Sequence, residues 1–191
     1  MWSSRDISLI ITFSAFTLVF GVLIGRVPDL ITGIAGIGYV FTIVYSISQS
    51  VLWSLFEGRR WRILVKVLLV RLISLLLFTS GSLSYVIPPT LATLLNSAII
   101  DIFFNSFYNY FKRKNKLLWW IILAQLYYWS THTLWILVFT SILYFPFESV
   151  IQYWFIPVAL VMLPIMIIEA IIGGSIGYKI YRRVERLLKK S

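Results

Sequence analysis

The sequence contains no cysteine and only one histidine, His132, in 191 residues. Without cysteine the chain can have no disulfide, no thiolate nucleophile and no cysteine-ligated metal. One histidine cannot form a polyhistidine metal site within one chain. We therefore expect neither a metal nor a cofactor. Charged residues are also scarce, at 13% of the chain, whereas soluble domains have about 25%.

Apolar residues, in contrast, make up 60% of the chain, whereas soluble domains have roughly 45–50%. A soluble protein of this length could not bury so much apolar surface, but a protein surrounded by lipid does not need to. The sequence therefore predicts an all-α protein of the cell membrane. The first apolar run resembles a signal peptide superficially, but its core is too long and residues 25–29 do not form a cleavage site, so we expect a retained helix.

A membrane-spanning helix needs about 20 mostly apolar residues. Six stretches meet this requirement: 7–25, 30–56, 63–85, 90–111, 117–145 and 150–178. Turns are expected between them at 26–29, at Pro88-Pro89 and at 146–148, and basic loops at 57–62 and 112–116. No soluble domain fits between these helices. The sequence thus predicts one domain over residues 1–191, a bundle of six transmembrane helices.

The distribution of basic residues predicts the orientation of this bundle. Fifteen of the seventeen Lys and Arg residues fall on one side: in the N-terminal segment, in the two basic loops, at Lys66 just inside the third helix, and in the C-terminal tail. The exceptions are Arg26 in an outer turn and Arg71 within a helix. The positive-inside rule places the basic side, and with it both termini, in the cytoplasm. Topology therefore accounts for the net charge of +10, and we expect no nucleic acid partner.

Three ionisable residues lie deep in the predicted helices: Arg71, Asp101 and Glu169. At 1.5 Å per residue they lie roughly 12, 15 and 13 Å from the cytoplasmic helix ends, so they can meet at one level. Ionisable groups at such depth usually face the bundle interior in pairs. We expect a buried ion cluster in which Arg71 pairs with Asp101 or Glu169. It either fixes the helix register or serves a substrate, and the sequence leaves both roles open.

The fifth predicted helix carries the best candidate for a ligand site. Its residues Gln125, Tyr128, Trp129, His132 and Trp135 share one face by helical periodicity. Aromatic walls with a few hydrogen-bonding groups suit a flat heterocyclic ligand, although the same pattern is typical of plain aromatic packing. We expect a cavity between the fourth, fifth and sixth helices that opens to the outside. The predicted lining residues are Asn96, Trp129, His132, Trp135, Gln152 and Trp154.

Polar and small residues on the other helices predict close packing. The fourth helix carries a polar stripe of Ser97, Asp101, Asn105 and Tyr108, and the second helix carries Tyr45, Ser46, Gln49 and Trp53. Small residues at four-residue spacing, as in Gly173-x-x-x-Gly177, allow helices to approach closely.

The layout and two motifs resemble the substrate-binding S-component of an energy-coupling factor (ECF) vitamin transporter. The start SRDISLI (4–10) is similar to the family's start, and the segment PIMIIEAIIGGSIGYKIYRR (164–183) more so. The resemblance implies a small protein that binds a vitamin-like ligand near its outer side. It also implies a transmembrane coupling subunit and two cytoplasmic ATPases as partners. The Ala-x-x-x-Ala of the family's first helix is absent; Ser8-x-x-x-Thr12 or Thr17-x-x-x-Gly21 stands in a comparable place.

Two other classes of function remain open from the residues alone. An intramembrane enzyme would need a catalytic motif, but Gly81-Ser82 has no nucleophile-type flanks and His132 has no zinc-binding partner. We therefore do not expect an enzyme. The second alternative is a membrane assembly protein without a ligand. The transporter subunit is our leading hypothesis, and the sequence does not identify its ligand.

Overall fold

The computed structural model describes residues 2–21, 23, 31, 43–77, 83–144 and 156–188 of the chain. Within these residues every regular element is helical. The elements are α1 (Ser4–Phe20), α3 (Ile43–Leu55), α4 (Arg62–Leu77), α5 (Leu83–Ile99), the π-helix η3 (Ile100–Phe104), α6 (Asn105–Arg113), α7 (Leu117–Leu143) and α9 (Ile156–Leu188). The prediction of an all-α protein is confirmed for this part of the chain.

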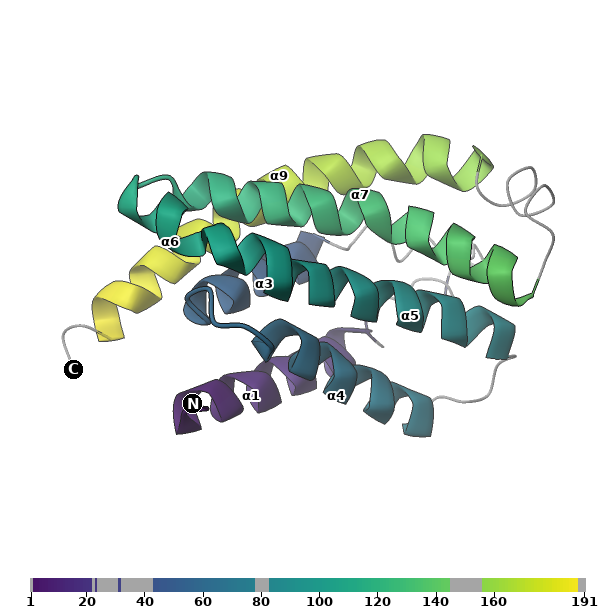
Figure 1. Ribbon diagram of the computed structural model, residues 1–191, viewed down its shortest axis with the longest axis horizontal. Helices are drawn as coiled ribbons and strands as arrows, with labels where there is room; N and C mark the ends of the chain where they lie inside the picture. The colour runs from purple at the N-terminus through teal and green to yellow at the C-terminus, as the bar shows by residue number, and fades with distance from the viewer. Residues whose placement is uncertain are drawn as a thin grey trace.

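The helices form an elongated bundle in which their ends gather at two poles (Figure 1). The start of α1, the α3–α4 turn, the α6–α7 turn and the end of α9 all lie at the same pole, on the left of Figure 1. Helix α9 packs against α3 and α7, and α7 also packs against α5. Helix α4 packs against both α1 and α5. The four segments predicted to share one side of a membrane thus lie together in space.

Helix bounds agree best with the prediction in the C-terminal half. The helix predicted over 117–145 is α7, Leu117–Leu143. The sixth predicted helix corresponds to α9, which begins at Ile156 and continues through the basic tail to Leu188. The first two predicted helices are represented by α1 and α3, and their remaining parts, with the turn at 26–29, lie largely outside the described residues.

The predicted turn at Pro88-Pro89 is wrong, because both prolines lie inside α5. Helix α4 ends at Leu77 and α5 begins at Leu83, so the boundary between the third and fourth helices lies earlier in the sequence. Both prolines lie within the first two turns of α5. In this part of the helix Thr90 donates its hydroxyl to Val86 O at 2.8 Å, and Thr93 donates to Pro89 O at 2.6 Å.

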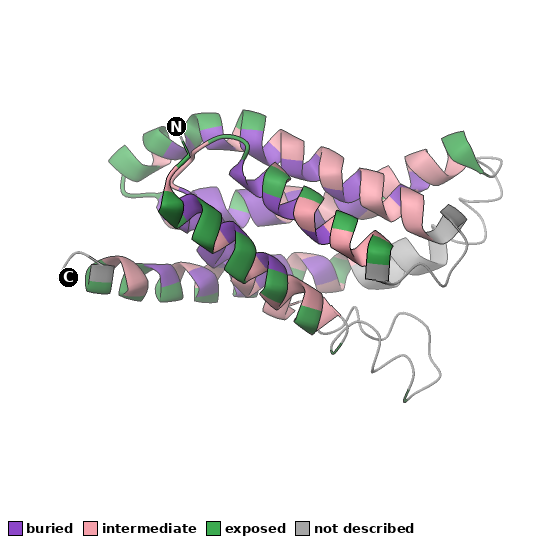
Figure 2. Cartoon of the chain, turned by 90° about the horizontal axis from the view of Figure 1, so that it is seen from below, coloured by how far each residue is buried: buried purple, intermediate pink, exposed green. Residues whose placement is uncertain are grey.

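The outer surface is strongly apolar, and the interior contains polar side chains beside an apolar core. Large apolar side chains lie exposed on the outer faces, among them Leu76 (82% exposed) and Ile142 (71%). Polar side chains are buried inside, with Asn96, Asp101 and Gln125 fully buried. Figure 2 shows exposed residues along the outward faces of the helices and buried residues turned toward the interior.

Two helices of the described chain are long and apolar enough to cross a membrane: Val86–Arg113 and Leu163–Leu187. The first is continuous through α5, η3 and α6, and the second lies within α9. Ile43–Leu55 is a shorter apolar helix. These findings are compatible with membrane insertion.

The contact between α9 and α3 depends on glycine. A Cβ atom built on Gly173 would lie 2.5 Å from Ser46 Oγ, and one built on Gly177 would lie 2.5 Å from Ser50 Cβ. Serine on α3 and glycine on α9 therefore face each other at the same four-residue spacing. This arrangement confirms that the Gly173-x-x-x-Gly177 pattern lies at a close helix contact.

A buried carboxylate, that of Asp6, connects the start of α1 to the α3–α4 turn. Asp6 is fully buried and forms a capping box with Ser3. Its Oδ1 lies 2.8 Å from Arg59 Nη1, and its Oδ2 lies 3.3 Å from Arg62 Nη2. Burial alone would raise the pKa of Asp6, but the Ser3 amide and the Arg59 charge, together with the Ser3 hydroxyl and Arg62, lower it below its ordinary value.

Candidate functional site

The expected ion pair between Arg71 and Asp101 is not formed. Asp101 Oδ2 accepts the backbone amide of Leu64 at 2.7 Å, and its Oδ1 accepts Asn105 Nδ2 at 2.9 Å. The Leu64 amide belongs to the first turn of α4, where amide groups have no acceptor within the helix. Asp101 therefore acts as an N-terminal cap for α4, supplied from the neighbouring helix. Negative charge is favourable there because of the helix dipole.

The ion pair between Arg71 and Asp101 was predicted from their similar depth, but depth along a helix does not determine the direction in which a side chain points. Asp101 lies in the five-residue π-helix η3, between α5 and α6. A π turn changes the angular position of residues relative to a regular α-helix. The carboxylate of Asp101 meets the start of α4 at Leu64, whereas Arg71 lies seven residues further along α4.

Arg71 instead interacts with α5. Its Nη2 donates to Thr93 Oγ1 at 2.6 Å. Glu169, the third predicted member of the cluster, is buried on α9 and accepts the backbone amide of Ile43 at 3.2 Å. Arg71 therefore contacts α5, Asp101 contacts α4, and Glu169 contacts α3.

Asn96 connects α5 to α7. Its Nδ2 donates to Tyr128 O at 3.1 Å, and its Oδ1 accepts the hydroxyl of Thr131 at 3.0 Å. The residue is fully buried, as predicted, but both ends of its amide are used within the protein. Asn96 thus holds two helices together, and its amide has no free end to offer a ligand in this conformation.

The predicted inward face of α7 is confirmed for four of its five residues, Gln125, Tyr128, Trp129 and His132, which are all buried. Trp129 Nε1 donates to Gln125 Oε1 at 2.9 Å. Gln125 Nε2 in turn donates to Ser46 O at 3.2 Å and to Ser50 Oγ at 3.0 Å. This network connects α7 to α3 and fixes the Trp129 ring within the interior.

His132 and Trp135 differ from this network, because their polar nitrogens lack partners. His132 Nδ1 and Trp135 Nε1 are buried without a hydrogen bond to any described residue, and Gln49 Oε1 on α3 is in the same condition. The His132 ring stacks on that of Tyr128, with centroids 6.0 Å apart and planes at 4°. Buried polar atoms are nearly always hydrogen-bonded. Other buried polar atoms without a described partner include Ser14 Oγ and Ser141 Oγ, but His132, Trp135 and Gln49 combine this capacity for hydrogen bonds with aromatic neighbours.

Gln49 on α3 and Thr93 on α5 extend this region beyond the residues predicted for the site. Gln49 Oε1 is one of the buried atoms without a described partner. Thr93 accepts from Arg71 on α4, and Asn96, three residues further along α5, bonds to Tyr128 O and Thr131 on α7. These polar side chains come from α3, α4, α5 and α7, whereas the cavity was predicted between the fourth, fifth and sixth helices. The polar stripe that includes Gln49 on the second predicted helix indicated the contribution of α3. Gln152 and Trp154 lie outside the described residues.

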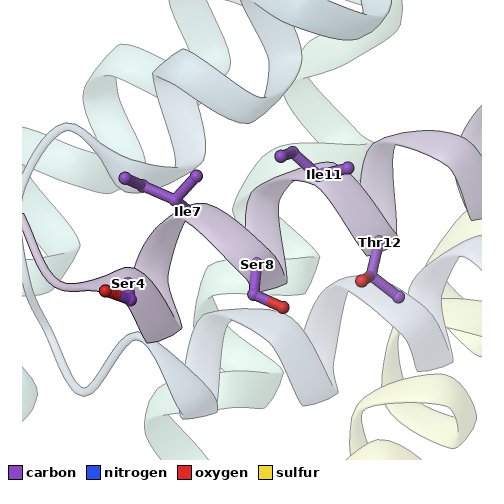
Figure 3. A pocket seen from close by; sticks show the side chains of 5 residues that line it. All are labelled: Ser4, Ile7, Ser8, Ile11 and Thr12. Carbon is purple, nitrogen blue, oxygen red and sulfur yellow. The ribbon is translucent and has the colours of Figure 1, made fainter.

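The outer face of α1 carries a groove of about 360 Å³. It is lined by Ser4, Ile7, Ser8, Ile11 and Thr12, which Figure 3 shows along one side of the helix. Ser4, Ser8 and Thr12 recur every four residues, so that the groove has a floor of small side chains beside two isoleucines. The groove lies on the surface and is separate from the polar interior.

Comparison with protein-family models, with curated proteins and with solved structures gives no match for this chain.

Proposed function

We propose that the chain is the membrane-embedded binding subunit of a micronutrient transporter, with six spans and both termini in the cytoplasm. The ligand is a vitamin or a related heterocycle, and separate ATPase subunits supply the energy. The apolar exterior and the polar interior support membrane insertion, because hydrocarbon tolerates apolar surface and penalises polar groups. The clustering of basic turns and chain ends at one pole supports the topology.

One observation carries the binding role: the unpartnered nitrogens of His132 and Trp135 lie beside stacked aromatic rings in the bundle interior. Aromatic walls with a few polar groups are typical of small-molecule sites. By contrast, the amide groups of Gln125 and Asn96 are paired with groups of the protein itself. On α7 the Gln125 amide is paired, whereas His132 Nδ1 and Trp135 Nε1 are not, which favours a ligand near His132.

The groove on α1 suits a partner helix. Small residues at four-residue spacing let helices approach closely in membranes, and Ser4, Ser8 and Thr12 are all exposed. The flanking Ile7 and Ile11 are 50% and 57% exposed. Following the resemblance to ECF S-components, we propose that this face contacts the coupling subunit, with Ser8-x-x-x-Thr12 in the place of the absent Ala-x-x-x-Ala pattern.

The cysteine-free chain allows a direct test of topology. A Lys114→Cys variant is expected to react with a membrane-impermeant maleimide only after the cells are permeabilised, because the α6–α7 turn is cytoplasmic in the proposed arrangement. A Ser80→Cys variant, between α4 and α5, is expected to react in intact cells. Labelling of Lys114→Cys in intact cells would contradict the six-span arrangement.

The binding role is tested on purified protein. Native mass spectrometry is expected to detect a bound small molecule, and purification from the source membrane is expected to bring ATPase subunits with it. Titration of heterocyclic vitamins, followed by tryptophan fluorescence, should identify a ligand. The His132→Ala variant should bind it about tenfold more weakly, because one buried hydrogen bond is lost.

A matched control for this titration is Trp119→Ala, which removes a 58% exposed aromatic residue from the outer face of the same helix. Its affinity should equal that of the wild type. Equal affinity of His132→Ala and wild type would remove His132 from the site. The absence of any bound molecule, any binding vitamin and any ATPase would favour an assembly protein instead.

A further inference from the structure

Arg71 is a cation within the bundle that has a hydroxyl partner. Its Nη2 donates to Thr93 Oγ1 at 2.6 Å, and the Thr93 hydroxyl donates its own proton to Pro89 O at 2.6 Å. Thr93 therefore orients the guanidinium but brings no negative charge to it. A guanidinium has five N–H donors, and the described residues give one hydrogen bond to this group.

The carboxylates of the described residues have partners other than Arg71. The ion pairs among the described residues involve Asp6, Glu57 and Glu185, all at the pole that holds the chain ends, and none of them includes Arg71. Asp101 directs its carboxylate to the start of α4, and the buried Glu169 on α9 accepts the backbone amide of Ile43 on α3. A second inward cation, Lys66, is 5% exposed and donates to the Thr17 hydroxyl at 2.7 Å. The interior around α4 thus carries positive charge held by neutral hydroxyl groups.

The surroundings of Arg71 are those of the proposed ligand site. Arg71 is bonded to Thr93 on α5, and Asn96, three residues further along the same helix, bonds to Tyr128 O and Thr131 on α7. Tyr128 and His132 present stacked rings, and His132 Nδ1 has no described partner. One region of the interior therefore combines a cation, flat aromatic surface and free hydrogen-bonding capacity.

We propose that the ligand carries an anionic group, a carboxylate or a phosphate, which Arg71 binds, and an aromatic part that lies against Tyr128 and His132. A charged side chain at membrane depth is costly and is normally compensated by an opposite charge. The planar fork of arginine matches carboxylate and phosphate oxygens in bidentate geometry. This inference rests on the proposed function and narrows its ligand class.

The test uses purified full-length protein with matched pairs of heteroaromatic probes. Nicotinate is compared with nicotinamide, and pyridoxine 5′-phosphate with pyridoxine, by tryptophan fluorescence titration at pH 7. The first pair tests a carboxylate and the second a phosphate. In at least one pair the anion should bind about tenfold or more tightly than its neutral partner, the worth of a charge-assisted hydrogen bond. A molecule that copurifies with the protein should likewise carry an acidic group.

Substitutions assign the preference to Arg71. Arg71→Gln should abolish the preference for the anion, whereas Arg71→Lys should retain part of it, because it keeps the charge and loses the fork. Lys66→Gln, which removes the other inward cation of the same helix, is the matched control and should retain the preference. A merely structural arginine would change the affinities for both members of a pair alike.

Three results would overturn the inference: equal affinity within both pairs, an anion preference that survives in Arg71→Gln, or a neutral or cationic copurified ligand. The proposed function fails in a different way. If neutral probes bind and His132→Ala weakens them, the protein is still a binding subunit and only the anionic ligand class is wrong. If no probe binds and nothing copurifies, both proposals are wrong.

Discussion

Replacing Asp6 with asparagine is expected to destabilise the protein by about 3 kcal/mol, because removing one partner of a buried ion pair leaves the other uncompensated. Asp6 is fully buried, and Arg62, which lies 3.3 Å from it, is 8% exposed. Arg59 is held by the same carboxylate at 2.8 Å. The substitution therefore releases the start of α1 from the α3–α4 turn. Chemical unfolding in detergent, followed by tryptophan fluorescence, measures the effect.

This contribution should depend on pH in a defined direction. The pKa of Asp6 is lower in the folded protein than its ordinary value of 3.8. A carboxyl group with a lowered folded-state pKa stabilises the protein above its unfolded-state pKa and loses this effect as the pH falls through the folded-state pKa. The difference between wild type and Asp6→Asn should therefore be constant above about pH 5 and shrink below about pH 4.

Glu57→Gln is the matched control for Asp6→Asn. Glu57 interacts with the same Arg59, at 3.7 Å, but both side chains are about one-third exposed. Exposed ion pairs contribute up to about 1 kcal/mol, so the loss should stay within that range. If the two variants lose the same stability, or if Asp6→Asn loses none, burial does not make the ion pairs of Asp6 more stabilising than the exposed pair of Glu57.

The sequence predicted helix type and inward faces well where the pattern was long and continuous. Helix α7 lies within two residues of its expected bounds. Ser97, Asp101, Asn105 and Tyr108 are all buried, as their helical spacing indicated. Periodicity identifies a face because each side chain's direction follows from its position in a regular helix.

Partners across helices were harder to predict, because they depend on how helices rotate against each other. Arg71 and Asp101 have similar depth, yet a π turn and the open amides of α4 direct Asp101 elsewhere. Pro88 and Pro89 indicated a turn, but both lie inside α5, which begins five residues before them at Leu83. Asp6 had a local signal that was not used: Ser3-x-x-Asp6 is a capping box. Its buried contact with Arg59 needs the tertiary structure.

Gly177→Ala, which adds one methyl group at the contact between α3 and α9, is expected to have the second large effect on stability. Alanine at Gly177 would place its Cβ 2.5 Å from Ser50 Cβ and 2.8 Å from Ile47 O. Neither atom is the end of a flexible side chain, so the helices must separate. We expect a steric cost of about 3 kcal/mol, which outweighs the roughly 1 kcal/mol that alanine gains over glycine in a helix. Unfolding in detergent should show a net loss of about 2 kcal/mol.

Gly174→Ala is the control on the neighbouring face of the same helix. Its Cβ would meet Ile122 Cγ1 at 3.3 Å, which a small shift of that side chain relieves, and Ile121 Cγ2 and Ile122 Cα at 3.6 Å, which is ordinary van der Waals contact. Helix propensity then dominates, and the variant should be as stable as the wild type or up to about 1 kcal/mol more stable. The two substitutions add the same methyl group three residues apart, so helix propensity cancels between them. Equal stability of the two variants would show that α3 and α9 do not approach each other at Gly177.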